Sequence, residues 1–221
     1  MDTGRVAQHE VTDEAGAGTA PGERTAYQPE VAPDGSPATR WVSWTLLVSG
    51  VVGLVASGAL MLDLLRVLEN PDYIPSCSWN PVLSCGSVMT TWQASVFGLA
   101  NPVLGIVGFA ALTTVGALLV AGTVLRDGLW WGMLAGTVGG MVFVHWLIWE
   151  SLFTLGALCP YCMVVWVVTV AAFLAVLSHL SLRGRLPWWV REYAGLALPA
   201  WAIVLGIAIL VRFWDYWSSV L

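Results

Sequence analysis

Residues 157–166 read ALCPYCMVVW and place Cys159 and Cys162 two residues apart, between long apolar stretches of the chain. Such a Cys-x-x-Cys pair can bind zinc, close a small disulfide, or cycle between dithiol and disulfide. Pro160 suits the first turn of a helix, where its missing N–H has no cost. The spacing therefore predicts a helix with Cys159 at its N-cap and Cys162 in its first turn, where free N–H groups and the helix dipole favour a thiolate.

The apolar stretches around this motif are long enough to cross a membrane, which requires ~20 mostly apolar residues. Five stretches contain no Asp, Glu, Lys or Arg: 41–62, 98–125, 128–149, 151–182 and 193–211. They predict transmembrane helices at 41–63, 98–122, 129–154, 159–181 and 194–214. A four-helix alternative omits the last, which contains Pro199, but proline is tolerated in membrane helices. Hydrophobic residues make up 57% of the chain and charged residues 10%, so we expect an all-α membrane protein.

The first forty residues have a different composition, rich in Ala, Gly, Pro, Thr and Glu, without an apolar period. Such a segment cannot bury enough surface to offset chain entropy, so we expect 1–40 to be a disordered cytoplasmic tail. A cleaved signal peptide is the alternative, but the apolar stretch 41–62 is longer than the usual ~7–15-residue signal core. The chain has no Lys and no basic stripe, which excludes nucleic acid as a partner.

Arginine positions predict the orientation, because positive residues beside membrane helices stay on the cytoplasmic side. A cytoplasmic N-terminus leaves seven arginines inside and two outside. The inside set is Arg5, Arg24, Arg40, Arg126, Arg183, Arg185 and Arg191, and the outside set is Arg66 and Arg212. Cys77 and Cys85, in the segment 63–97, then lie with Cys159 and Cys162 on the oxidising, extracytoplasmic side of a bacterial-type inner membrane.

Four cysteines on one side of a membrane are consistent with three kinds of site. Two structural disulfides are one, although a Cys-x-x-Cys disulfide removes little entropy from the unfolded chain. A four-Cys zinc site is another, but it usually has two short knuckles, and seven residues separate Cys77 from Cys85. The third is a redox relay, because residues 84–93, SCGSVMTTWQ, can begin a short helix capped by Ser84 or Ser87 and carrying Cys85 near its start.

The combined pattern resembles the vitamin K epoxide reductase family, in particular bacterial homologues without a fused thioredoxin-like domain. The pattern is Cys77-x7-Cys85, then Thr91, FGL at 97–99, Asn101, and LCPYC at 158–162. The resemblance covers 41–182 and implies a four-helix catalytic core around a quinone. Within it, 63–97 is the periplasmic cysteine loop with a short capping helix. The remainder, 183–221, is expected to be a cytoplasmic loop and a fifth transmembrane helix with an extracytoplasmic C-terminus.

The resemblance also implies roles for single residues. Cys77 would react with the thiol partner, Cys85 would exchange with Cys159, and Cys162 would face the quinone. Asn101 and Thr91 match family positions at the quinone, although Asn101 could instead cap or kink a helix and Thr91 could simply bond a nearby carbonyl. Trp166 stands where vertebrate members have a head-group-binding Tyr, so it can stack but cannot offer a phenolic hydroxyl, and this departure weakens an expectation of epoxide chemistry.

One further site candidate comes from the apolar runs, because ionisable groups inside a bilayer are functional candidates. Glu150 falls in the third predicted span, about one turn from its outer end, and is a candidate for proton delivery. Asp63 is interpreted as marking the end of the first span.

We therefore expect a membrane thiol:quinone oxidoreductase that oxidises a separate, periplasmic DsbA-like thioredoxin-fold partner and supports disulfide bond formation. Menaquinone or ubiquinone would accept the electrons, and the catalytic step would need no metal. The nearest functional rival is a DsbB-type enzyme. A family enzyme could also run in the reducing direction, on vitamin K quinone or its epoxide. Two rivals of a different class are a non-enzymatic disulfide-stapled scaffold and a transmembrane electron conduit, which would need a cysteine reachable from the cytoplasm.

Overall fold

The computed structural model describes residues 38–70, 72–89, 91–95 and 98–220. The expected tail, 1–40, lies outside the described residues except for its last three, and Phe97 of the family-like FGL triplet lies outside them as well. All described residues belong to one unit of the chain, 32–221.

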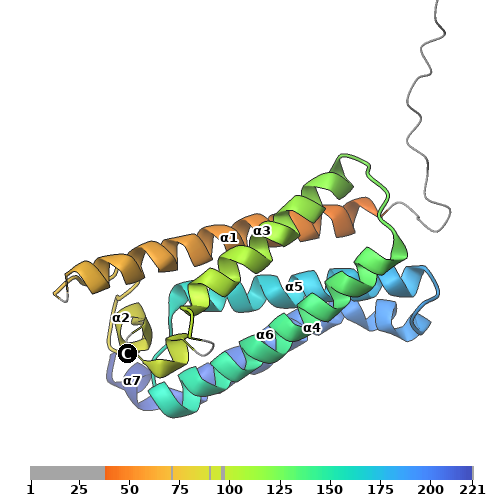
Figure 1. Ribbon diagram of the computed structural model, residues 1–221. Helices are drawn as coiled ribbons and strands as arrows, with labels where there is room; N and C mark the ends of the chain where they lie inside the picture. The colour runs from red at the N-terminus through yellow and green to blue at the C-terminus, as the bar shows by residue number, and fades with distance from the viewer. Residues whose placement is uncertain (1–37, 71, 90, 96–97, 221) are drawn as a thin grey trace, which may run out of the picture. The chain divides into compact units, whose positions relative to one another are not determined.

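The described part of the chain is helical and contains no strand, and five of its helices are long and apolar enough to span a membrane. These are α1 (Arg40–Glu69), α3 (Asn101–Val120), α4 (Asp127–Trp149) continued by the π-helix η2 (Glu150–Leu155), α5 (Pro160–Leu182) and α6 (Trp188–Arg212). Three short elements are α2 (Cys85–Met89), the 3-10 helix η1 (Trp92–Ser95) and α7 (Trp214–Val220). The prediction of an all-α membrane protein with five spans is confirmed, and Figure 1 shows the order of the helices.

The first helix is longer than expected. The sequence 64–69 reads LLRVLE and consists mainly of good helix formers, so α1 continues through Asp63 and ends at Glu69. Pro71 follows two residues later and disfavours a helical conformation for the residue before it. The cysteine loop therefore begins at Asn70, and Asp63 lies inside the helix.

Glycines allow α1 and α3 to approach closely. A Cβ atom on Gly116 would lie 2.5 Å from the backbone nitrogen of Leu47, and one on Gly50 would lie 2.6 Å from the backbone nitrogen of Thr113. Small residues replace hydrophobic driving force as the main determinant of helix packing in a bilayer, because lipid is as apolar as the helix surface. This pair of helices forms one wall of the bundle.

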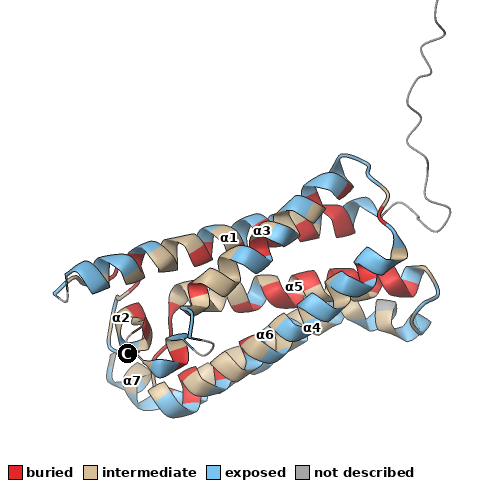
Figure 2. Ribbon diagram, in the orientation of Figure 1, coloured by how far each residue is buried: buried red, intermediate tan, exposed pale blue. Residues whose placement is uncertain are grey.

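The helix α5 is the centre of the bundle, since it packs against α1, α4 and α6. Figure 2 shows buried residues concentrated along α5, whereas α6 is largely exposed. The helices α3 and α4, although consecutive, do not pack closely against each other. Their separation leaves space inside the bundle, beside the start of α5.

The end of the bundle that contains the α3–α4 and α5–α6 connections is densely packed and charged at its rim. Asp127 at the start of α4 forms ion pairs with Arg183 and Arg185, just after α5. The His179 ring stacks on Trp130 with the ring centroids 3.6 Å apart, and both side chains are almost fully buried. The four cysteines lie at the opposite end.

Candidate functional site: four cysteines beside an apolar cavity

The Cys-x-x-Cys motif has the local structure that its sequence predicts. Cys159 is the N-cap of α5, Pro160 occupies the first turn, and the backbone N–H of Cys162 donates a hydrogen bond to Cys159 Sγ at 3.5 Å. Hydrogen bonds from Cys162, first from its side chain and then from its backbone, lower the pKa of the Cys159 thiol from its ordinary value, although burial acts in the opposite direction. Cys159 is therefore the cysteine of this pair that is better prepared to carry negative charge.

A short backbone clamp brings the cysteine loop to this motif. Leu83 forms an isolated parallel bridge with Leu158. The Leu158 N–H donates to the carbonyl of Val82 at 2.7 Å, and the Ser84 N–H donates to the carbonyl of Leu158 at 2.9 Å. Because Cys85 and Cys159 follow these paired residues directly, the clamp sets their separation.

The resulting geometry places three sulfur atoms together. Cys77 and Cys85 form a disulfide, while Cys159 and Cys162 are free thiols. The Sγ atoms of Cys85 and Cys159 are 3.1 Å apart, and the Sγ atoms of Cys77, Cys85 and Cys159 all lie within 4.8 Å of one another. Three clustered cysteines could also ligate a metal ion, but two of these sulfurs are joined to each other and are not thiolates. The arrangement is suited to thiol–disulfide exchange, which requires contact between a thiolate and a disulfide sulfur.

The short helix that carries Cys85 is held by the loop before it. Cys85 is the first residue of α2, and the N–H of Gly86 donates to the Ser78 hydroxyl at 3.3 Å. The hydroxyl of Ser87 instead donates to the carbonyl of Ser84. The expected short helix at Cys85 is present, but the acceptor at its start is Ser78, which the linear pattern around 84–93 does not include.

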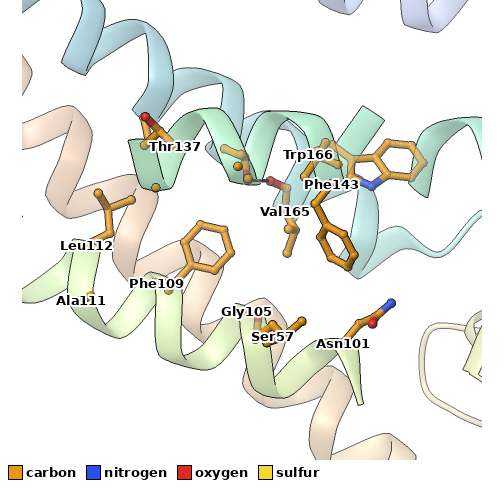
Figure 3. A pocket seen from close by; sticks show the side chains of 18 of the residues that line it. Ser57, Asn101, Gly105, Phe109, Ala111, Leu112, Thr137, Phe143, Val165 and Trp166 are labelled. Atoms are coloured by element: carbon orange, nitrogen blue, oxygen red, sulfur yellow. Dashed lines mark hydrogen bonds between the residues drawn. The ribbon is translucent and has the colours of Figure 1, made fainter. Parts of the chain in front are cut away.

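A cavity of about 600 Å³ opens inside the bundle next to the cysteines. Its walls come from α1, α3, α4 and α5, and its few polar side chains are those of Ser57, Asn101, Thr137, Cys162, Trp166 and Thr169. Figure 3 shows Asn101 at one end of the cavity and Leu112 and Thr137 at the other. An apolar slot with an amide and a thiol at one end fits an aromatic quinone ring with a lipid-like chain.

Two of the three residues expected at a quinone line this cavity. Asn101, the first residue of α3, donates from its Nδ2 to the carbonyl of Gln93 at 2.6 Å, and Trp166 is 1% exposed. The indole N–H of Trp166 is buried and has no hydrogen-bond partner among the described residues. Thr91 is not in the lining, and its hydroxyl donates to the carbonyl of Val88 at 2.8 Å.

Glu150 reaches a second, smaller cavity of about 60 Å³, which Asn101, Cys159 and Cys162 also line. It begins the π-helical turn that ends α4, and π-turns frequently occur at functional sites. Gln93 donates from its Nε2 to the Glu150 carboxylate at 3.2 Å. The structure thus brings the acid expected from the sequence to the cysteines and links it through Gln93 to Asn101.

Sequence reasoning missed Gln93 and underestimated Asp63. Nothing in the linear pattern marks Gln93, a 4% exposed amide that contacts both Glu150 and Asn101. Asp63 does carry a signal, since it is an acid with Arg66 three residues later, but an acid after a long apolar stretch also fits the end of a span. In the structure it is 3% exposed and faces the cysteine loop.

Residues 44–177 match the family model described as the vitamin K epoxide reductase family, and these residues include all four cysteines and both cavities. No curated protein matches the chain.

Proposed function

The chain belongs to the vitamin K epoxide reductase family, and we propose on this basis that it is a membrane thiol:quinone oxidoreductase. Membership makes the protein a membrane oxidoreductase that uses cysteine redox chemistry, and members of the family use quinones. The finer proposal is that it oxidises thiols of a DsbA-like thioredoxin-fold partner, passes the electrons through two cysteine pairs, and thereby supports disulfide bond formation.

The observation that carries this proposal is the 3.1 Å distance between Cys85 Sγ and Cys159 Sγ. These residues are 74 positions apart in the sequence, and each belongs to a different cysteine pair. Electrons can therefore pass from the loop pair to the Cys159/Cys162 pair by thiol–disulfide exchange, without a metal and without movement of the helices.

The cavity supports the assignment of the electron acceptor. Cys162 lines it beside Asn101, whose amide is a group that can hydrogen-bond a carbonyl oxygen, and Trp166 offers an aromatic surface. The chemistry that a bound quinone supplies is the acceptance of two electrons and two protons. Gly105 on α3 and Gly136 on α4 also line this cavity, and α3 and α4 do not pack closely against each other.

Glu150 is the candidate for proton delivery in this scheme. Its carboxylate is held by Gln93 and borders the small cavity shared with Cys159 and Cys162. A carboxyl group at this position can hold a proton close to the reacting sulfurs and pass it toward Asn101. Substitution by Gln would keep the hydrogen bond but remove the exchangeable acid.

The proposed orientation places the cysteine end outside the cytoplasm, with the arginines around Asp127 inside. Cys77 would accept the attack of the partner, and it is 2% exposed in the structure. A partner thiol can therefore reach Cys77 only when the loop that follows α1 moves. Thr91 lies in the turn after α2, where it would act on this capping region rather than on the cavity.

Purified full-length protein in detergent, supplied with dithiothreitol and a short-chain quinone, tests the proposal. We expect quinol formation, and we expect Cys159→Ser or Cys162→Ser to reduce the rate by about three orders of magnitude, because removal of a nucleophile typically has an effect of this size or larger. Ser87→Ala is the matched control, since it removes an exposed hydroxyl from the same helix as Cys85. Absence of quinol formation by the wild type, or full activity of the cysteine variants, would contradict the proposal and favour a stapled scaffold.

A further inference from the structure

Asp63 is a buried carboxylate that the electron path described above does not use. It lies on α1, six residues before the end of the helix, and is 3% exposed. Its oxygen atoms face the loop that carries Cys77, and an acid buried at this depth in a membrane helix requires partners.

The partners of Asp63 are hydrogen-bond donors and a cation, which are partners of an ionised carboxylate. The Tyr73 hydroxyl donates to Oδ1 at 3.1 Å, and the Ser76 hydroxyl donates to Oδ2 at 3.1 Å. Arg66 lies 3.5 Å from Oδ1. Tyr73 and Ser76 both belong to the cysteine loop, so the carboxylate also anchors that loop to α1.

The same carboxylate contacts one of the reacting sulfurs. Cys77 Sγ lies 3.9 Å from Oδ2 of Asp63. Cys159 Sγ has a different environment, because it accepts the N–H of Cys162 at the start of a 23-residue helix. The two sulfurs that compete for Cys85 thus face opposite electrostatic surroundings: a negative group at Cys77 and a hydrogen-bond donor at Cys159.

We propose that the Asp63 carboxylate directs the internal exchange, by disfavouring a thiolate on Cys77 and thereby leaving the electron pair on Cys159. The inference rests on the proposed relay. In the step concerned, the Cys77 thiolate attacks Cys85 Sγ of a Cys85–Cys159 disulfide. The Cys77–Cys85 bond forms, the Cys85–Cys159 bond breaks, and the electron pair departs on Cys159. One thiolate enters and one leaves, so no further oxidant or reductant is needed.

The other charged or titratable groups around this site do not cancel the effect. Arg66 contacts Oδ1, whereas Oδ2 faces Cys77, and the Arg66 side chain is 57% exposed, so water screens its charge. Glu69 adds negative charge near Arg66, Tyr73 donates to Oδ1, and Tyr161 of α5 reaches the site only through Ser76, at 3.4 Å. The Asp63 charge also acts on Cys159, but as the smallest of the influences on that thiol.

A full-length Cys162→Ser variant allows the exchange to be measured directly. It retains three cysteines, so one disulfide per chain distributes over Cys77–Cys85, Cys85–Cys159 and Cys77–Cys159, of which the first two report the exchange. The serine hydroxyl preserves a donor to Cys159. The protein is reduced, reoxidised with diamide to one disulfide, and equilibrated at several values from about pH 6 to about pH 9.5, a range that brackets the ordinary Cys pKa. Acid quenching, alkylation and peptide mass spectrometry then give the ratio of the two disulfides.

The pH dependence of this ratio separates a charge effect from a structural one. The Cys162 N–H at the helix start favours a thiolate on Cys159, whereas the Asp63 carboxylate disfavours one on Cys77, so rising pH stabilises the isomer in which Cys159 is free. The ratio of Cys77–Cys85 to Cys85–Cys159 should therefore increase with pH. Adding Asp63→Asn should leave the ratio near pH 6 unchanged and lower it near pH 9.5 by about tenfold, the size of effect that one charge within ~4–6 Å produces.

Three further variants control for the loop and for folding. Tyr73→Phe and Ser76→Ala remove the hydroxyl donors but keep the charge, so each should preserve the rise with pH. Arg66→Gln, at a mostly exposed position, removes a cation that offsets the Asp63 charge, so it should make the disulfide ratio rise more steeply with pH. The inference is overturned, while the relay stands, if the disulfide ratio of the Asp63→Asn variant equals that of its parent at all pH values. It is also overturned if Tyr73→Phe reduces the rise of this ratio with pH as much as Asp63→Asn does. If no Cys85–Cys159 disulfide forms at any pH, the relay itself fails and the inference fails with it.

Discussion

The cysteine end and the arginine end of the bundle differ in how they use buried polar groups. At the cysteine end, Asp63 contacts Cys77, while Gln93 and the partly buried Glu150 line the small cavity with Cys159 and Cys162, and the large cavity reaches Cys162. At the arginine end, Trp130 and His179 are stacked within a cluster of fully buried apolar side chains. The indole nitrogen of Trp130 and Nε2 of His179 have no hydrogen-bond partner among the described residues.

This difference indicates that one end of the bundle contributes mainly to stability and the other end to the candidate site. The arginine end stabilises the fold through a cluster of buried side chains from α1, α3, α4 and α5, although the large cavity extends along this cluster as far as Val115 and Leu129. At the cysteine end, the departure from close packing coincides with the proposed quinone site. Natural proteins commonly place such departures at functional sites and compensate for them elsewhere. Variants at the two ends should therefore separate stability from activity.

Trp130→Ala should have the largest effect on stability. The residue is fully buried, and its removal leaves a cavity and an unstacked His179. We expect a loss of about 3 kcal/mol in the free energy of unfolding, the lower end of the range for such substitutions, because lipid supplies little hydrophobic driving force. Thermal unfolding in detergent measures the loss. Quinone reduction per folded molecule should persist, and its disappearance would show that the two ends are coupled.

Gly136→Phe should have the next largest effect, and on quinone use rather than stability. A Cβ atom on Gly136 would meet no heavy atom within 4 Å, and the residue lines the large cavity. The phenyl ring should occupy the slot and raise the KM for a long-chain quinone by about tenfold, or about 1.4 kcal/mol. Gly195→Phe is the matched control, since Gly195 on α6 is equally uncrowded but does not line the cavity. Equal KM values for the two variants would mean that the cavity is not the quinone site.

Asp127→Asn should have the smallest effect. It weakens the ion pairs with Arg183 and Arg185, of which Arg185 is about half exposed. Pairs of this kind contribute roughly 1 kcal/mol or less, and less at high salt. Unfolding at low and high salt, compared between variant and wild type, checks the value. A loss as large as that of Trp130→Ala would show that charges, rather than packing, hold this end together.

Local features of the fold and the site followed from the sequence, because short-range physics determines them. Pro160 and Cys159 specify a helix start whatever surrounds them, and the structure has the cap in place. Uncharged stretches of about twenty residues leave a helix as the main option in lipid, which is why all five spans were predicted. The continuation of α1 past Asp63 was missed because a charge can mark the end of a span without ending the helix, which its neighbours extend.

Contacts between distant segments could not be predicted from the sequence in the same way. The hydroxyl of Thr91 donates to the Val88 carbonyl, and its role at the quinone stays a prediction. Gln93 was not anticipated, although it hydrogen-bonds both Asn101 and Glu150, the latter 57 residues further along the chain. The exchange of Cys85 with Cys159 was expected only from family resemblance and stays a prediction, but the Leu83–Leu158 clamp gives a physical cause for the approach of the two sulfurs.

The amino-acid sequence by itself determined that this chain is helical, that it crosses a membrane, and that Cys159 begins a helix as a potential thiolate. Those properties depend on hydrophobic length, on Pro160 and on spacing within one turn. The tertiary structure alone decided that Cys85 touches Cys159, that Asp63 faces Cys77, and that a cavity separates α3 from α4. These depend on how helices pack, which is set by many weak contacts between residues far apart in the chain.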